Sequence, residues 1–139
     1  MKITQLSIFV ENKVGRLSHI TGVLAKNGIN ILKMSLADTT EFGILRIIAD
    51  DADKAYRALR DADVMVSKTE VVAVRVGHVP GALNKLLAII GEEGIQIEYM
   101  YNYSAKDLGG HEEMIIVLRL SDQQNAVGLL KARGVQVLN

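Results

Sequence analysis

The sequence predicts an α+β fold that consists of two βαββαβ units in tandem. A repeat with a fixed offset runs through the chain, because Gly15 and Leu17 recur 66 residues later as Gly81 and Leu83. Stretches that alternate between apolar and polar residues, as strands do, are interspersed with stretches that have the period of a helix. Both copies place these stretches in the same order: strand, helix, strand, strand, helix, strand. The chain is therefore interpreted as a duplicated split βαβ unit.

The composition excludes several classes of protein. The chain has 139 residues, of which 49% are hydrophobic and 23% charged, as in compact globular proteins. Its formal net charge is zero, so no basic field attracts nucleic acid or anionic lipid. Cysteine is absent, which excludes disulfides and thiolate metal sites. The chain starts with a strand pattern instead of a signal-peptide core and lacks an apolar run of about 20 residues, so we expect a cytoplasmic protein without nucleic-acid or membrane partners.

The first copy opens with an alternating stretch and then changes to a helical pattern. Gly15 begins the helix, whose apolar stripe includes Ile20 and Leu24, and Asn27-Gly28 is typical of a helix end. Carboxylates within 50–53 mark the start of the second helix, because the helix dipole favours negative charge there. Strands are predicted at 2–10, 29–37, 42–49 and 64–66, with a turn at 39–41.

The second copy repeats this order with a short insertion. Beyond the third strand the offset grows from 66 to 71, since Leu59 matches Leu130, and the added residues fall within 104–113. Ser121-Asp122 is expected to cap the last helix. Only the polar residues 67–70 interrupt the strand pattern between the copies, so we predict domains at 1–69 and 70–139. The strands of this copy are predicted at 71–76, 95–103, 114–120 and 135–138.

No constellation typical of catalysis or of metal binding is found in the sequence. The serines are not in nucleophile elbows, and His19, His78 and His111 are scattered. His111-Glu112-Glu113 suggests a divalent metal at first sight, but adjacent residues of a strand point to opposite faces and metal ligands must converge. We therefore expect no enzymatic activity, no metal and no cofactor.

The loop between the first strand and the first helix is the strongest candidate for a binding site. Gly15 leaves room for a ligand near the backbone, and the helix behind it presents free N–H groups and a positive dipole end that suit a carboxylate. Asn12 can donate and accept hydrogen bonds, so it can bind an ammonium or an amide. From this loop alone, the alternative of a tight turn without a ligand has equal weight.

A polar amide follows Gly-Ile at the start of the second strand in both copies, as Asn30 and Gln96. We expect each amide near the same end of its unit as the loop. The amide could also lie on the solvated face of the strand. Two copies keep it at one register, however, which favours a role in binding.

The sequence 11–17, Glu-Asn-Lys-Val-Gly-Arg-Leu, and the sequence Gly28-Ile29-Asn30-Ile31 resemble the ACT domain, as do their equivalents in the second copy. This family comprises small amino-acid-binding regulatory modules of biosynthetic enzymes, and the resemblance covers the whole chain as two units. The family's loop usually has Pro-Gly followed by a leucine. The second copy keeps this pattern in Pro80-Gly81-Ala82-Leu83, whereas the first has Val14 in place of proline.

The resemblance implies that two ferredoxin-like units pair side by side, with antiparallel strands and with helices on one face, and bind an amino acid at their interface. The loop of one unit would face the start of the second strand of the other. The ligand's carboxylate would bind backbone N–H groups of the loop, and its ammonium would bind Asn12 or Glu98. One site would comprise Asn12, Val14, Gly15, Arg16, Leu17, Gln96, Ile97 and Glu98. The other would comprise Asn30, Ile31, Leu32, His78, Val79, Pro80, Gly81, Ala82 and Leu83.

The resulting expectation is a sensor that binds a free amino acid and regulates a separate protein, with a homodimer as a further option. An assembly module that uses the same sheet but binds no ligand is the first alternative, and a small enzyme ranks last. The sequence does not identify the amino acid. Tyr99, Tyr101 and Tyr103 allow an aromatic contact with it, but a core or interface stripe is favoured.

Overall fold

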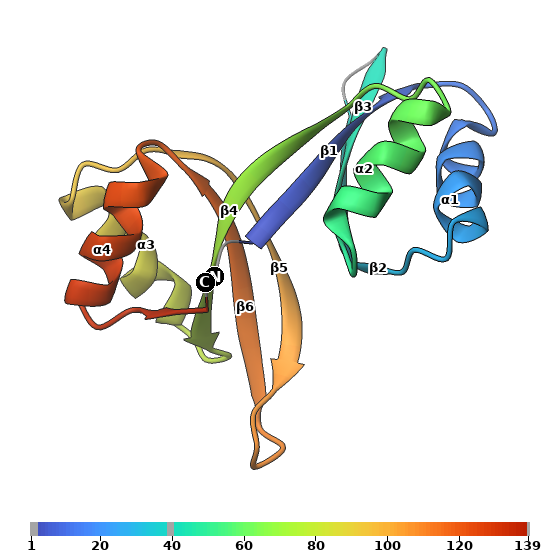
Figure 1. The fold of residues 1–139 in the computed structure, drawn as a ribbon. Coiled ribbons are helices and arrows are strands. Elements are labelled where there is room, and N and C mark those ends of the chain that lie inside the picture. Colours follow the sequence, from blue (N-terminus) through green and yellow to red (C-terminus); the bar gives the residue numbers. More distant parts are fainter. Residues whose placement is uncertain (1–2, 39–40, 139) are drawn as a thin grey trace. The chain divides into compact units, whose positions relative to one another are not determined.

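The computed structural model describes residues 3–38 and 41–138 of the chain (Figure 1). The chain divides into two compact units. The N-terminal unit is Thr4–Thr69, and the C-terminal unit joins Glu70–Asn139 to Met1–Ile3. The turn expected at Thr39-Thr40 and the strand start expected at Lys2 lie outside the described residues.

The N-terminal unit has the predicted order of strands and helices. β3 pairs antiparallel with both β1 and β2, and the start of β4 lies beside β1, so the spatial order is β2-β3-β1-β4. This order is that of a split βαβ unit, in which the crossover through a helix leaves room for a third strand between the first two. Its elements are β1 (Ile3–Glu11), α1 (Arg16–Lys26), β2 (Ile31–Asp38), β3 (Phe42–Ala49), α2 (Ala52–Asp61) and the first residues of β4 (Val66–Gly77).

The C-terminal unit repeats the same topology. Here β6 pairs antiparallel with β4 and β5, while β7 pairs with the other edge of β4, so the order is β5-β6-β4-β7. The α+β fold class and the βαββαβ order are thus confirmed for both units. Besides the later residues of β4, the elements are α3 (Ala82–Glu92), β5 (Ile97–Lys106), β6 (Glu112–Leu120), α4 (Gln123–Ala132) and β7 (Gln136–Val137).

The predicted interruption at 67–70 is wrong, because β4 continues through these residues without a break. Their polar side chains suggested a loop, but strand pairing uses the backbone and tolerates polar side chains that find partners. Lys68 does so on α2, where its Nζ lies 2.7 Å from Asp53 Oδ1 and 4.8 Å from the centre of the Tyr56 ring. The Lys68 ammonium accordingly lowers the pKa of the Asp53 carboxyl.

Each unit has a core of its own between its sheet and its two helices (Figure 1). In the N-terminal unit alternate residues of β1, namely Leu6, Ile8 and Val10, pack against α1 and α2. In the C-terminal unit Val72 and Val74 take the equivalent places beneath α3 and α4. The remaining side chains of these strands therefore project from the face opposite the helices.

The ends of the helices follow the sequence signals with one exception. Gly28 and Gly94 adopt φ of 67° and 69°, which is the left-handed helix end that their position predicts. Asp51 caps α2, as its Oδ1 accepts a hydrogen bond from Lys54 N–H at 3.1 Å. The predicted cap of α4 does not form. Asp122 makes no side-chain cap bond, and Ser121 Oγ accepts the N–H of Gln96 instead, at 2.9 Å.

Replacing Leu59 with alanine should lower the free energy of unfolding by about 3 kcal/mol, because it removes a fully buried side chain and leaves a cavity. Urea unfolding followed by circular dichroism measures this change. Leu108→Ala is the control, since the Leu108 side chain is fully exposed. Equal midpoints for the two variants would contradict the placement of Leu59 in the core.

Asp51→Ala should lower the free energy of unfolding by about 1 kcal/mol, because the Lys54 N–H loses its acceptor. Asp51→Asn keeps an acceptor oxygen at the same place and should have a much smaller effect. The same unfolding measurement compares the two variants. The cap would have no energetic role if both variants unfolded like the natural chain.

Candidate functional site

The N-terminal loop is defined as residues 11–17. At one position, Gly15, its backbone has a conformation that only glycine adopts readily. Gly15 lies just before α1 with φ 87° and ψ −6°, in the left-handed region. The N–H of Lys13 donates to Glu11 O at 2.8 Å, and the N–H of Arg16 donates to Lys13 O at 3.3 Å. A Cβ on Gly15 would meet no atom within 4 Å. Glycine is thus required by the backbone angle, and the space beside it is open.

The C-terminal loop, defined as residues 77–83, repeats this geometry. Gly81 precedes α3 with φ 88° and ψ −15°. The N–H of Ala82 donates to Val79 O at 3.3 Å, which is the bond that Arg16 and Lys13 make in the first loop. A Cβ on Gly81 would also meet open space. Two loops 66 residues apart therefore have the same backbone geometry.

Both loops leave backbone N–H groups without acceptors at the start of a helix. His19 and Lys85 are the first residues whose N–H groups bond back to the loop glycine, at 2.9 Å and 3.0 Å. Neither α1 nor α3 has a side-chain cap. Among the described residues no acceptor faces the N–H groups of Leu17, Ser18, Leu83 and Asn84. Such N–H groups, at the positive end of the helix dipole, suit a carboxylate.

The two loops differ in charge. In the N-terminal loop the Lys13 ammonium lies 3.1 Å from the Glu11 carboxylate and lowers the pKa of that carboxyl through a hydrogen bond and its charge. Arg16 Nε is buried there, with no hydrogen-bond partner in the described part of the chain. The C-terminal loop has the uncharged residues Gly77, Val79 and Ala82 at the corresponding positions.

A cavity of about 310 Å³ lies at the C-terminal loop. Five of its six lining residues were predicted as site residues, Leu83 among them. Met114 was not predicted as a site residue. The repeat offset of 71 makes it the equivalent of Gly43, so the sequence already shows that the two copies differ at this position. The lining residues are His78, Val79, Pro80, Gly81, Leu83 and Met114.

The expectation that each amide lies near the loop of its own unit is wrong. Glu11, at the loop end of β1, pairs with Phe42, whereas Ile31, next to Asn30, pairs with Ala49 at the other end of β3. These two ends of β3 are about 23 Å apart, at roughly 3.3 Å per residue. β1 and β2 run in the same direction, so that the end of one and the start of the other lie at opposite ends of the sheet.

The C-terminal unit shows the same separation between its loop and its amide. Gly77 pairs with Glu113 at the start of β6, and Ile97 pairs with Leu120 at its end. In neither unit, therefore, can one ligand of amino-acid size contact both the loop and the amide of that same unit.

The backbone of each amide residue is held by the turn that follows the neighbouring strand. Asn30 N–H donates to Asp50 Oδ1 at 3.1 Å, and Asp50 N–H donates to Asn30 O at 3.0 Å. Gln96 has the same two bonds with Ser121, both at 2.9 Å. Both amide side chains are exposed. Glu98, expected as a partner for a ligand's ammonium, instead pairs with Arg119 across 3.1 Å.

Tyr99, Tyr101 and Tyr103 form a half-buried stripe on β5, alternating with the exposed Met100 and Asn102. Burial raises the pKa of the Tyr103 hydroxyl, and the charge of Arg75 opposes this rise. A stripe of partly buried tyrosines is thus present on the sheet, and these tyrosines are not among the residues that line the loop cavity.

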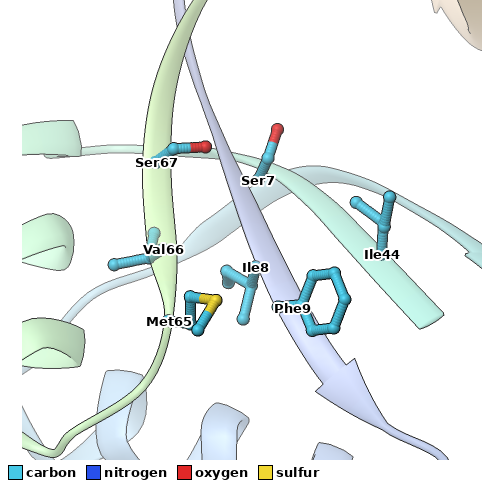
Figure 2. A pocket seen from close by; sticks show the side chains of 7 residues that line it. All are labelled: Ser7, Ile8, Phe9, Ile44, Met65, Val66 and Ser67. Carbon is cyan, nitrogen blue, oxygen red and sulfur yellow. The ribbon is translucent and has the colours of Figure 1, made fainter. Parts of the chain in front are cut away.

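A second hollow, of about 310 Å³, lies in the N-terminal unit along β1 and the start of β4 (Figure 2). Phe9 and Ile44 are paired in register and alternate with core residues, so they project from the face opposite the helices. Phe9 also contacts Phe42, with ring centres 4.8 Å apart. The hollow was not predicted, and it is lined by Ser7, Ile8, Phe9, Ile44, Met65, Val66 and Ser67.

The inserted segment between β5 and β6 forms a turn around Asp107. Its Oδ1 accepts the N–H groups of Gly109 and His111, at 2.9 Å and 2.8 Å. Among residues 3–38 and 41–138, no three His, Asp or Glu side chains gather as metal ligands would. None of the helices in these ranges has the length and apolar character that crossing a bilayer requires.

This chain is similar to several known proteins. A family model described as the ACT domain pair matches residues 1–138. A solved protein structure from Bacteroides thetaiotaomicron is 43% identical in sequence, with a TM-score of 0.88, and the match covers 99% of this chain and 92% of that one. The search of curated proteins finds no match.

Two solved regulatory subunits of aspartate kinase share the fold at 16% identity. The subunit from Thermus thermophilus, in a ligand-free form, has a TM-score of 0.64 over 96% of this chain and 92% of that chain. The subunit from Thermus flavus has a TM-score of 0.65 over 95% and 90%. The family model extends almost from end to end and agrees with the two βαββαβ units of the structure. The chain therefore belongs to the family of ACT domain pairs.

Proposed function

We propose that this protein is a non-catalytic sensor that binds a free amino acid at its two loops and regulates a partner protein. The observation that carries the proposal is the repeated loop geometry: a left-handed glycine with open space beside it, followed by two N–H groups without acceptors. Membership of the ACT domain pair family supports it. The two Thermus proteins that share the fold are likewise described as regulatory subunits.

In this proposal the ligand's carboxylate binds the free N–H groups at the start of α1 or α3. At the N-terminal loop the ammonium binds the side-chain oxygen of Asn12, which can accept a hydrogen bond. Since each unit's own amide lies at the far end of its sheet, the strand start that completes a site comes from another unit. Asn30–Leu32 and Gln96–Glu98 are the two strand starts in question.

Regulation follows from a ligand that contacts two structural units at once. Such a ligand stabilises the arrangement in which both contacts are made, and a partner that binds this arrangement preferentially is thereby coupled to the ligand. The coupling needs no chemistry on the ligand, which fits a site made of backbone N–H groups and an amide.

A thermal-shift screen of the twenty amino acids tests the proposal on the full chain. A ligand that binds only the folded state raises the melting temperature, by an amount that grows with ligand concentration. At least one amino acid should do so. If none changes the melting temperature at concentrations up to the millimolar range, the sensor function is wrong.

The double variant Gly15→Asp, Gly81→Asp should lose this thermal shift, because each aspartate fills the open space and repels a carboxylate. Gly28→Asp, Gly94→Asp is the matched control. These glycines also have a left-handed backbone and open space, but they lie at the C-terminal ends of α1 and α3. The control therefore introduces the same charge and similar strain. Loss of the shift in both double variants would remove the support for the loops as the binding sites.

An assembly module without a ligand is the second candidate, favoured by apolar side chains exposed on the N-terminal unit. Phe9 and Phe42 are about two-fifths exposed, and Met65 is 71% exposed. Phe9→Ser, Met65→Ser should then reduce self-association in sedimentation velocity experiments, whereas amino acids should change nothing. A chain that responds to an amino acid and sediments identically with and without these substitutions would exclude this candidate.

A further inference from the structure

We propose that the C-terminal loop takes an amino acid with an uncharged aliphatic side chain, of the size class of leucine and methionine. This inference rests on the proposed function and adds the class of ligand at one of its two loops. The observations that lead to it are the cavity at this loop, the chemistry of its lining, and the differences from the N-terminal loop.

The cavity has the size and the position that a free amino acid requires. Its volume of about 310 Å³ is at the small end of the range for ligand pockets. Gly81 and Leu83 line it, so it adjoins the start of α3, where the Leu83 and Asn84 N–H groups have no acceptor among the described residues. A carboxylate bound to these N–H groups leaves the ligand's side chain beside the cavity wall.

Among the residues that the structure describes, no acidic residue, lysine or arginine lines this cavity. Four apolar residues, Val79, Pro80, Leu83 and Met114, line it together with Gly81 and His78. A charged ligand side chain here would find no ion-pair partner, whereas an aliphatic side chain gains from contact with the apolar wall. The lining therefore selects against aspartate, glutamate, lysine and arginine as ligands.

Met114 is the wall residue that distinguishes this loop from its counterpart. The equivalent residue in the N-terminal unit is Gly43, where an added Cβ would come within 3.2 Å of Leu36 Cδ1. There Leu36 from the edge strand covers the glycine. In the C-terminal unit the large apolar side chain is on the central strand at Met114, and the position of Leu36 is taken by Asn102. In the C-terminal unit, therefore, β6 contributes the apolar residue Met114 to the cavity beside the C-terminal loop.

Calorimetric titrations of the Gly15→Asp chain test the class of ligand, because in this chain only the C-terminal loop remains able to bind. Leucine or methionine should bind at least tenfold more tightly than aspartate and lysine. Tighter binding of aspartate or lysine would overturn the inference but leave the proposed function intact. If the natural chain binds none of the twenty amino acids, the proposed function itself is wrong, so the two failures are distinguishable.

Met114→Gln in the Gly15→Asp chain tests whether the side chain of the ligand contacts Met114. Glutamine keeps the shape and charge of methionine but replaces its thioether with an amide, so leucine or methionine should bind about tenfold more weakly. Met114→Leu, which keeps the wall apolar, should retain the affinity. Met100→Gln is the matched control, because Met100 lies in the same unit outside the cavity. Melting curves without ligand confirm that each variant is folded. Unchanged affinity in a folded Met114→Gln chain would overturn the inference.

Discussion

The pairing of one central strand with two parallel neighbours is the constraint on which the rest of each unit depends. β3 lies between β1 and β2, and β6 lies between β4 and β5. Because the two outer strands run the same way, a helix must cross over the sheet to connect them. This crossover places the loop and its left-handed glycine at one end of the sheet and the amide at the other. The loop and the amide of one unit are consequently too far apart to contact the same small ligand.

The two units keep the pattern of core residues but have changed the side chains on the opposite face. Phe9 and Phe42 form an aromatic pair in the N-terminal unit, with ring centres 4.8 Å apart. At the equivalent positions of the C-terminal unit, Arg75 and Glu113 form an ion pair, with 2.6 Å between Nε and Oε2. The register is the same in both cases. Backbone pairing and core packing thus fix the positions, while the chemistry on the face without helices is free to differ.

Much of this could be predicted from the sequence, where local signals determine the structure. The alternation of Leu6, Ile8 and Val10 gave the strand and its buried face, and Gly28 gave the end of the helix. The errors arose where a partner distant in sequence decides the outcome. Lys68 lies in a continuous strand, where its ammonium pairs with Asp53 on α2.

Ser121 is a second case of the same kind. It does not cap α4 because the N–H of Gln96 uses its hydroxyl, and Gln96 lies 25 residues earlier in the chain. The position of Asn30 at one end of the sheet depends likewise on the direction in which β2 runs. No single residue encodes that direction. The wall residue Met114 was missed for a related reason, since its place beside the C-terminal loop comes from strand pairing between Val76 and Met114.

The duplication also explains how two similar loops can acquire different chemistry. In a homodimer of single units every substitution appears twice, so both sites change together. In a duplicated chain the two loops are separate sequences, and a change in one leaves the other as it was. The N-terminal loop has Lys13 and Arg16 where the C-terminal loop has Val79 and Ala82, yet their glycines share the same backbone angles. The backbone can therefore keep one geometry in both loops while the neighbouring side chains differ in charge and polarity.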